Sequence, residues 1–272
     1  DTWHAMGQGA TTGSLVVTLE ALKEMHLTPE DIQLIQNDTK TCPDTGMAGA
    51  SRSLYMDGNA TIIAANKLLA AMRKEDGTLR TYDEMKAEGI ETKYLGRYET
   101  NTTPGLCRLD PNTGIGDPTP AFTYCLNLAE VEVDTKTGKT TVLKFTCVDF
   151  VGRIGNIDAV NGQAYSGIMH GIGFALKEDY ADVKKHANMF GAGTSYIKDV
   201  PDDINLIHID GAISDGPFGS SGASEAFQAS GHCAVLNGIY NACGVRIHEI
   251  PALPEKVKAG LDAIAKGEKP YE

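Results

Sequence analysis

The clearest fold signal in the sequence is a β-hairpin. Residues 121–134 (AFTYCLNLAEVEVD) and 140–152 (TTVLKFTCVDFVG) are rich in strand-forming side chains, and the segment TKTGK joins them. Gly138 supplies the backbone freedom that such a turn needs. The chain must therefore contain an antiparallel ribbon near its middle, and the other elements pack against this ribbon or form a separate unit.

Helical patterns surround the hairpin. Apolar side chains recur at helical spacing in four segments, residues 11–27, 51–74, 156–177 and 225–242, and a last helix starts near residue 254. The expected buried faces carry Leu15, Val16, Leu19 and Leu22; Ile62, Ala65, Leu69 and Met72; and Val235, Gly238, Ile239 and Ala242. Short strands are expected at 32–38 and 204–210. This order predicts an α+β protein with mixed sheets and packed helices, divided into subdomains 1–120 and 121–272.

The charge balance excludes one class of partner. Asp and Glu number 36 against 24 Lys and Arg, which gives a formal charge of −12. Nucleic-acid binding needs clustered basic groups, so we expect no nucleic-acid partner. An anionic ligand would have to be held by backbone N–H groups and helix N-termini.

Two further absences shape the expectations. No apolar run approaches the roughly 20 residues of a membrane span, and the first ten residues lack the basic and apolar regions of a signal peptide. We therefore expect a cytoplasmic protein. Six cysteines show neither CxxC pairs nor zinc or iron–sulfur spacing, which favours free buried thiols. The missing initiator Met suggests a piece of a longer protein or one subunit of an assembly.

Four loops share one plan, in which small residues and glycines lead into a helix. They are Gly7-Gln8-Gly9; Ala48-Gly49-Ala50-Ser51; Gly155-Asn156; and Gly219-Ser220-Ser221-Gly222-Ala223-Ser224. Helix N-termini present unsatisfied N–H groups and partial positive charge, so four of them together would make an anion cradle. Each loop alone is also explained as an ordinary turn or cap, and none matches the usual dinucleotide or ATP motifs.

Several side chains near these loops have two explanations each. The amides of Gln8 and Gln163 suit the edge of a cofactor, but surface or core amides look the same in sequence. Arg52 could contact phosphate or pair with an acid, and His4 is undecided between core and site. The helix at 156–177 is unusually rich in glycine, which indicates close approach to another backbone or to a ligand.

Glu225 directly follows the loop GPFGSSGAS. One explanation is an acid in the first turn of a helix, which the helix dipole favours by about 0.3–1 kcal/mol. The other is a general base presented to a reacting centre by a loop that leaves room for a bulky cofactor. No G-x-S-x-G elbow surrounds Ser221 or Ser224, so a hydrolase is a poor explanation.

Five segments together resemble a known family. MGQG (6–9), AGASR (48–52), NGQAYSGIMHGIG (161–173), DGPFGSSGASE (215–225) and NACGVRIHEIPALPEKV (241–257) resemble, in order and spacing, the C-terminal molybdopterin-binding half of the xanthine oxidase family. The likeness is greatest to bacterial aldehyde oxidoreductases. It implies the fold of that half, with two molybdopterin-binding subdomains, the second carrying the catalytic glutamate.

The resemblance also implies a cofactor and residue roles. Family members bind molybdenum through a pyranopterin dithiolene, often as the cytosine dinucleotide, and no protein side chain ligates the metal directly. Glu225 matches the glutamate that takes the proton from the metal-bound hydroxyl. Gln8 and its flanking glycines would lie near the metal's oxo group and Gln163 along the pterin, while residues 48–50 and 220–224 would line the cofactor.

The resemblance covers only part of the family's machinery. The [2Fe–2S] domains and the other molybdopterin-binding half lie outside this sequence, so we expect partner chains or domains that carry them, and no activity from this chain alone. The implied reaction is oxidation of an aldehyde to a carboxylic acid with oxygen from water. The alternatives are the same chemistry on a purine or other N-heteroaromatic ring, and a non-catalytic assembly subunit.

Overall fold

The computed structural model describes residues 3–36, 38–45, 48–99, 110–116, 119 and 121–270. These residues form two compact units, and each unit combines segments from different parts of the chain. The first unit consists of Asp1–Thr123, Val151–Ala159 and Asp210–Gly222, and the second of Tyr124–Phe150, Val160–Ile209 and Ala223–Glu272. The subdomain division 1–120 and 121–272 remains a prediction, and two later segments belong to the first unit.

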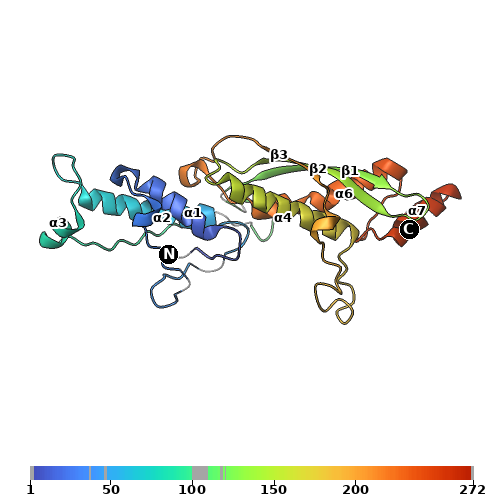
Figure 1. The fold of residues 1–272 in the computed structure, drawn as a ribbon, viewed down its shortest axis with the longest axis horizontal. Coiled ribbons are helices and arrows are strands. Elements are labelled where there is room, and N and C mark those ends of the chain that lie inside the picture. The colour runs from blue at the N-terminus through green and yellow to red at the C-terminus, as the bar shows by residue number, and fades with distance from the viewer. Residues whose placement is uncertain are drawn as a thin grey trace. The chain divides into compact units, whose positions relative to one another are not determined.

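The first unit is built on two helices that pack side by side, α1 (Ala10–Ala21) and α2 (Ser53–Met72) (Figure 1). Ala10 and Val17 join Trp3 in one buried cluster, and Leu22, Ala65 and Leu69 form a second. The buried line on α1 is Ala10, Ser14 and Val17. Of the expected face, Leu22 is buried, whereas Leu15, Val16 and Leu19 are half-buried.

Short elements complete the first unit. Two 3₁₀ turns, Lys23–Met25 and Pro29–Asp31, follow α1. Helix α3 (Tyr82–Ala87) starts with a capping box in which Thr81 and Glu84 satisfy each other's backbone N–H groups. The expected strand at 32–38 is wrong for residues 32–36, which form no strand because no described segment pairs with them; Asn37 lies outside the described residues.

The second unit contains a three-stranded sheet of order β1-β2-β3 within the described residues. Strands β1 (Tyr124–Val133) and β2 (Thr140–Phe150) form the predicted antiparallel hairpin, and Gly138 has φ +78° in its turn. Strand β3 (Asp203–His208) lies parallel to β2, close to the predicted position. Burial alternates along β1 and β3, so one face of each strand points inward.

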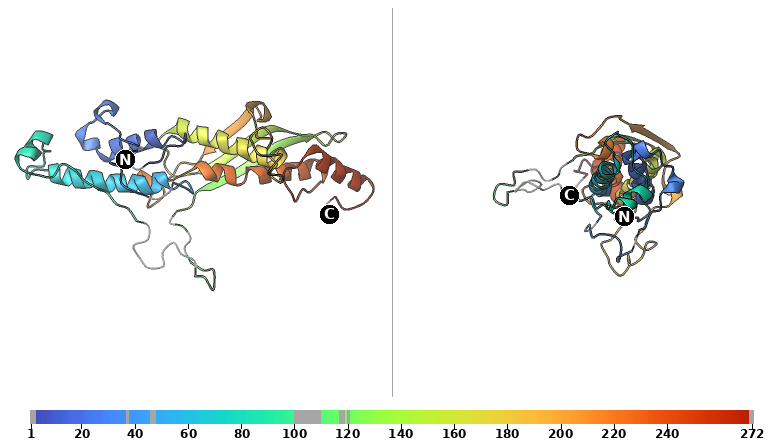
Figure 2. Two further views of the ribbon diagram at one scale, coloured as in Figure 1. Left: turned by 90° about the horizontal axis from the view of Figure 1, so that it is seen from below. Right: turned by 90° about the vertical axis from the view of Figure 1, so that its left-hand side faces the viewer.

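Helices α4 (Ile157–Leu176), α5 (Ser224–Ala229) and α6 (Gly231–Cys243) pack against one face of this sheet (Figure 2, left). The glycines of α4 allow close approach, as predicted: a Cβ on Gly167 would lie 2.6 Å from the Phe227 Cβ, and one on Gly171 would lie 2.8 Å from the Gly231 Cα. The helix expected at 225–242 is broken at Ser230 into α5 and α6.

The end of the chain packs onto the same unit. Helix α7 (Pro254–Ala265) buries Val257 in a cluster with Ile239, Val245 and Ala252. Val235 and Ile239 of α6 are fully buried as expected, whereas Ala242 is exposed.

None of the described helices is long and apolar enough to cross a membrane. Within the described residues no two cysteines form a disulfide with each other. Of these cysteines only Cys147 is fully buried and Cys233 is exposed, and Cys107 lies outside the described residues.

Candidate functional site

The first predicted loop enters α1 through two glycines in the left-handed region. Gly7 has φ +101° and Gly9 has φ +86°, conformations that side chains other than glycine rarely adopt. Gly9 is the N-cap of α1 and provides no side-chain cap. The Gln8 amide holds this loop, because its Oε1 accepts from the Met6 N–H and its Nε2 donates to the His4 carbonyl, each at 2.5 Å. The loop therefore presents backbone N–H groups at a helix N-terminus.

The second loop enters α2 with a strained backbone. Ala50 and Ser51 both have φ 53°, a region that non-glycine residues seldom occupy. Such conformations cluster at ligand sites because surrounding structure must hold them in place. Arg52 is the N-cap of α2, and its side chain makes no cap hydrogen bond.

The third loop lies against the second. Its 3₁₀ turn (Pro217–Gly219) packs on α2, where a Cβ on Gly58 would lie 2.7 Å from the Pro217 Cγ. A Cβ on Gly222 would lie only 1.6 Å from the Ser51 carbonyl oxygen, so the two backbones touch. Only glycine fits at position 222, which explains one of the glycines that the sequence places before Glu225.

The fourth loop connects the third loop to α1. Ser220 donates its hydroxyl to the Arg153 carbonyl at 2.6 Å, and the Asn156 Oδ1 caps α4 by accepting from the Ala159 N–H at 3.0 Å. A Cβ on Gly9 would lie 3.5 Å from the Ala159 Cβ, and one on Gly155 would lie 3.5 Å from Val16. Asn156 therefore caps the helix that the sequence predicts from residue 156.

These contacts join the four loops into one continuous group within the first unit. The first and fourth loops meet through the helix residues Ala159 and Val16. Arg153, two residues before the fourth loop, bonds to Ser220 of the third, and the third loop contacts the second directly. The sequence predicted the four loops but not their order of contact. The group offers glycine backbone and helix N-termini, the features with which proteins bind phosphate and other anions without bulk positive charge.

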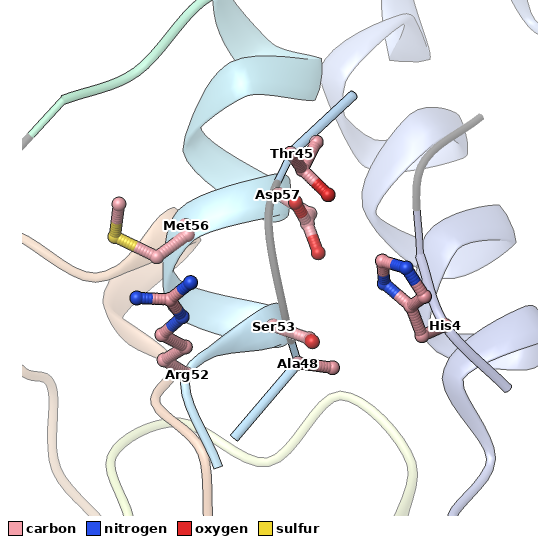
Figure 3. A pocket seen from close by; sticks show the side chains of 7 residues that line it. All are labelled: His4, Thr45, Ala48, Arg52, Ser53, Met56 and Asp57. Atoms are coloured by element: carbon pink, nitrogen blue, oxygen red, sulfur yellow. The ribbon is translucent and has the colours of Figure 1, made fainter. Parts of the chain in front are cut away.

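A small open pocket lies beside the start of α2 (Figure 3). Its volume is about 250 Å³ with its mouth included, less than the roughly 300–1,000 Å³ of a complete ligand site. In Figure 3 the His4 imidazole faces Ser53 and Asp57 of α2. The lining residues are His4, Thr45, Ala48, Arg52, Ser53, Met56 and Asp57. Two of these residues, Ala48 and Arg52, were predicted from the sequence to bind the cofactor. The sequence analysis did not predict Asp57, although an acid within an apolar helix could have drawn attention to it; in the structure Asp57 is nearly buried.

The remaining predicted residues belong to the second unit. Gly222 ends the first unit and Ala223 begins the second, so the third loop and Glu225 are joined by the chain across this boundary. Ala223 is the N-cap of α5, Ser224 begins this helix and Glu225 lies exposed in its first turn. Phe227, fully buried against Gly167, fixes α5 on α4. Gln163 is half-exposed in the second turn of α4.

A buried polar network, which sequence reasoning missed, anchors the same part of α4. Asp149 accepts from the His208 Nδ1 at 2.7 Å, and the His208 Nε2 lies 2.8 Å from the Asn161 Oδ1. Burial raises the pKa of the Asp149 carboxyl, and the hydrogen bond from His208 opposes this shift. The network ties β2 and β3 to α4 two residues before Gln163, and no local motif marks it.

The chemistry of the loops fits a large anionic cofactor. The two residues that begin α1 and α2, Gly9 and Arg52, cap their helices with no side chain of their own, which leaves helix-starting N–H groups to donate to an anion. The described part of the chain contains no group of three or more His, Cys, Asp or Glu that could hold a metal ion. Backbone N–H groups at helix starts are donors that suit a phosphate-bearing group.

Comparison with known proteins supports the same conclusion. Residues 2–201 match the model of the molybdopterin cofactor-binding domain. The chain is 42% identical over 261 residues to the aldehyde oxidoreductase of Megalodesulfovibrio gigas, covering 96% of this chain and 28% of that protein. It is 28% identical to the probable hypoxanthine oxidase XdhD of Escherichia coli, covering 96% of this chain and 29% of that protein.

A solved structure shows the same fold. The crystal structure of the aldehyde oxidoreductase from Desulfovibrio desulfuricans matches with a TM-score of 0.90 and 45% identity over 95% of this chain. This chain covers 28% of that one, so it spans under a third of the length of these relatives. The chain therefore belongs to the xanthine oxidase family and forms part of its molybdopterin cofactor-binding region.

Proposed function

We propose that this chain is the cofactor-binding portion of a molybdenum-dependent aldehyde oxidoreductase, with Glu225 as its general base. The contacts that bring the four glycine loops together carry the proposal, in a chain whose residues 2–201 match the molybdopterin cofactor-binding domain. The 42% identity to an aldehyde oxidoreductase, against 28% to a probable hypoxanthine oxidase, favours aldehydes as substrates.

The loops would hold the cofactor through their backbone. The N–H groups that start α1, α2 and α4 would donate to phosphate and pterin oxygens, and the small side chains of residues 220–224 would leave room for the ring system. The amides of Gln8 and Gln163 serve as donors and acceptors at the cofactor's edge. We propose the cytosine dinucleotide form of molybdopterin, whose second phosphate adds charge for these N–H groups to bind.

When bound, the molybdenum cofactor supplies the two-electron oxidation of the substrate carbon. An aldehyde and water thereby become a carboxylic acid, two protons and two electrons, and the electrons leave through a [2Fe–2S] protein or domain. Glu225 accepts one proton from the oxygen source as the new carbon–oxygen bond forms. Phe227, buried against α4, holds the first turn of α5 so that this carboxylate keeps its position.

A second part of the proposal concerns the length of the chain, which is much shorter than its relatives. Because it covers 28% of the aldehyde oxidoreductase, the rest of the cofactor cage would come from a companion polypeptide or a further part of the same protein. We propose that the chain is inactive without it.

Replacing Glu225 with glutamine in the complete protein tests the assignment. Glutamine has nearly the same shape but cannot accept the proton, so kcat with an aldehyde should fall about 10²–10⁴-fold while molybdenum content stays near the wild-type value. Glu255→Gln is the matched control, since Glu255 also lies in the first turn of a helix, α7, and its replacement should leave kcat unchanged. Full activity in Glu225→Gln would remove the residue from this role.

The second candidate function is oxidation of a purine ring, which the likeness to a probable hypoxanthine oxidase supports. A substrate panel separates the two: kcat/KM should be higher for small aldehydes than for hypoxanthine. Turnover of hypoxanthine alone would favour the second candidate, and a protein without molybdenum would favour a non-catalytic assembly subunit.

A further inference from the structure

The outer face of the sheet in the second unit is apolar and exposed. We define the outer face as the side chains of Tyr124, Leu126 and Leu128 on β1, Val148 and Phe150 on β2, and Ile207 on β3, and the strand register places the polar Thr146 and Asn205 on the same side, next to Leu128. Tyr124, Leu126, Leu128 and Ile207 are 63%, 58%, 56% and 43% exposed. Such a contiguous apolar patch on a soluble protein marks an interaction surface.

The helices of this unit cover the opposite face. The Asn127 amide donates to the Ser230 hydroxyl at 2.9 Å, and a Cβ on Gly238 of α6 would lie 3.1 Å from Val131. His208 reaches α4 through Asn161. These contacts use the side chains that alternate with the outer face, so α4, α5 and α6 are all engaged on the inner side.

The order of apolar and polar side chains along β1 indicates that another polypeptide segment covers the outer face. A half-exposed strand normally carries apolar residues inward and polar residues outward. Here Cys125 and Asn127 point inward, whereas Tyr124, Leu126 and Leu128 point outward.

The face also has the layout of a protein–protein interface. Its far end carries Glu130 opposite Lys144, and Lys144 forms an ion pair with Asp203 at 3.4 Å. An apolar centre with a charged rim is the usual anatomy of such interfaces. The residues at the apolar end, with Tyr124 and Phe150 rings 6.4 Å apart, would be its anchors.

We propose that the outer face docks the companion portion, defined as the part of the relatives' polypeptide that this chain does not span. The chain matches its relative with a TM-score of 0.90 yet covers only 28% of it, so most of that protein lies outside this fold and is available to cover the sheet. This inference rests on the proposed function, in which the companion portion completes the cofactor cage. It adds the surface that holds the two together.

Crosslinking in the complete protein tests the occupant. A photoreactive benzoyl-phenylalanine at position 126 should crosslink to a peptide outside residues 1–272, identified by mass spectrometry. The control carries the same probe at Ile264, which is 40% exposed on α7 and away from the sheet face. Crosslinks from position 126 to residues 3–123, to a second copy of this chain, or to nothing would overturn the proposal.

A second variant measures coverage without a bulky probe. In the complete protein, a cysteine introduced as Leu126→Cys should react with iodoacetamide at least about tenfold more slowly than one introduced as Ile264→Cys, read by peptide mapping. Equal rates would mean that the face is bare. Molybdenum is measured on the same preparations: its absence would contradict the proposed function, whereas the crosslinks and labelling rates decide the docking surface independently.

Discussion

Replacing Gly167 with alanine tests whether the glycines of α4 serve close packing. The new Cβ would lie 2.6 Å from the Phe227 Cβ, 2.7 Å from the Phe227 carbonyl carbon and 2.9 Å from the Gln228 nitrogen. All three are about 1 Å inside normal contact distance, and none belongs to the flexible end of a side chain. Helix α5 must therefore move away from α4.

The magnitude follows from two opposing effects. Overpacking against a rigid backbone costs about 3 kcal/mol, the upper part of the usual range, and the gain in helix propensity returns about 1 kcal/mol. The net loss of local stability is about 2 kcal/mol. Gly162→Ala is the matched control on the same helix, because no atom lies within 4 Å of its added Cβ; it should stabilise α4 by about 1 kcal/mol.

Hydrogen exchange with mass spectrometry on the complete protein measures this difference. Peptides from α4 and α5 should exchange about 30-fold faster in Gly167→Ala, the factor that corresponds to 2 kcal/mol. The same peptides in Gly162→Ala should exchange more slowly than in the wild type. Equal protection in the two variants would refute the packing explanation for these glycines.

Three further predictions concern the caps and ionisable groups. Asn156→Ala removes the acceptor for the Ala159 N–H and should weaken the first turn of α4 by about 1 kcal/mol, seen as about fivefold faster exchange there; unchanged exchange would mean that the cap is dispensable. The pKa of Glu84 is lowered to about 2 by hydrogen bonds from the Lys74 ammonium and from the backbone and hydroxyl of Thr81. Because this pKa is depressed, Glu84 stabilises the fold above its unfolded pKa of about 4.3 and this contribution is lost as the pH falls through about 2. An NMR titration should show the low midpoint, and Lys74→Met should move it upward; a wild-type midpoint near 4 would contradict the pairing. The Cys125–Cys147 hydrogen bond, followed by burial, raises the pKa of the Cys147 thiol, so iodoacetamide should modify exposed Cys233 first at neutral pH; equal rates would mean that Cys147 is accessible.

Local signals predicted most of the fold. Alternating residues around Gly138 indicated the hairpin, and Asn156 marked the start of α4, because each depends on neighbours in sequence. The strand expected at 32–38 was wrong for residues 32–36, since a strand needs a partner that local pattern does not reveal. The break at Ser230 did have a local signal, the Ser-Gly pair at 230–231, which is typical of a turn.

The candidate site was predictable in its parts and not in its assembly. Glycine loops before helices are visible in sequence, whereas the contact between Ser51 and Gly222 arises from packing between distant segments. The network of Asp149, His208 and Asn161 was invisible for the same reason. The roles of individual residues, Glu225 above all, remain predictions for experiment.

The molybdenum content of the purified complete protein tests the central claim most directly. If the glycine loops hold a molybdopterin cofactor, metal analysis should find about one molybdenum for each copy of this chain, and acid hydrolysis should release a cytosine nucleotide in equal amount. Gly222→Ala, whose Cβ would lie 1.6 Å from the Ser51 carbonyl oxygen, should lower that content. A properly folded wild-type protein without molybdenum or pterin would contradict the account.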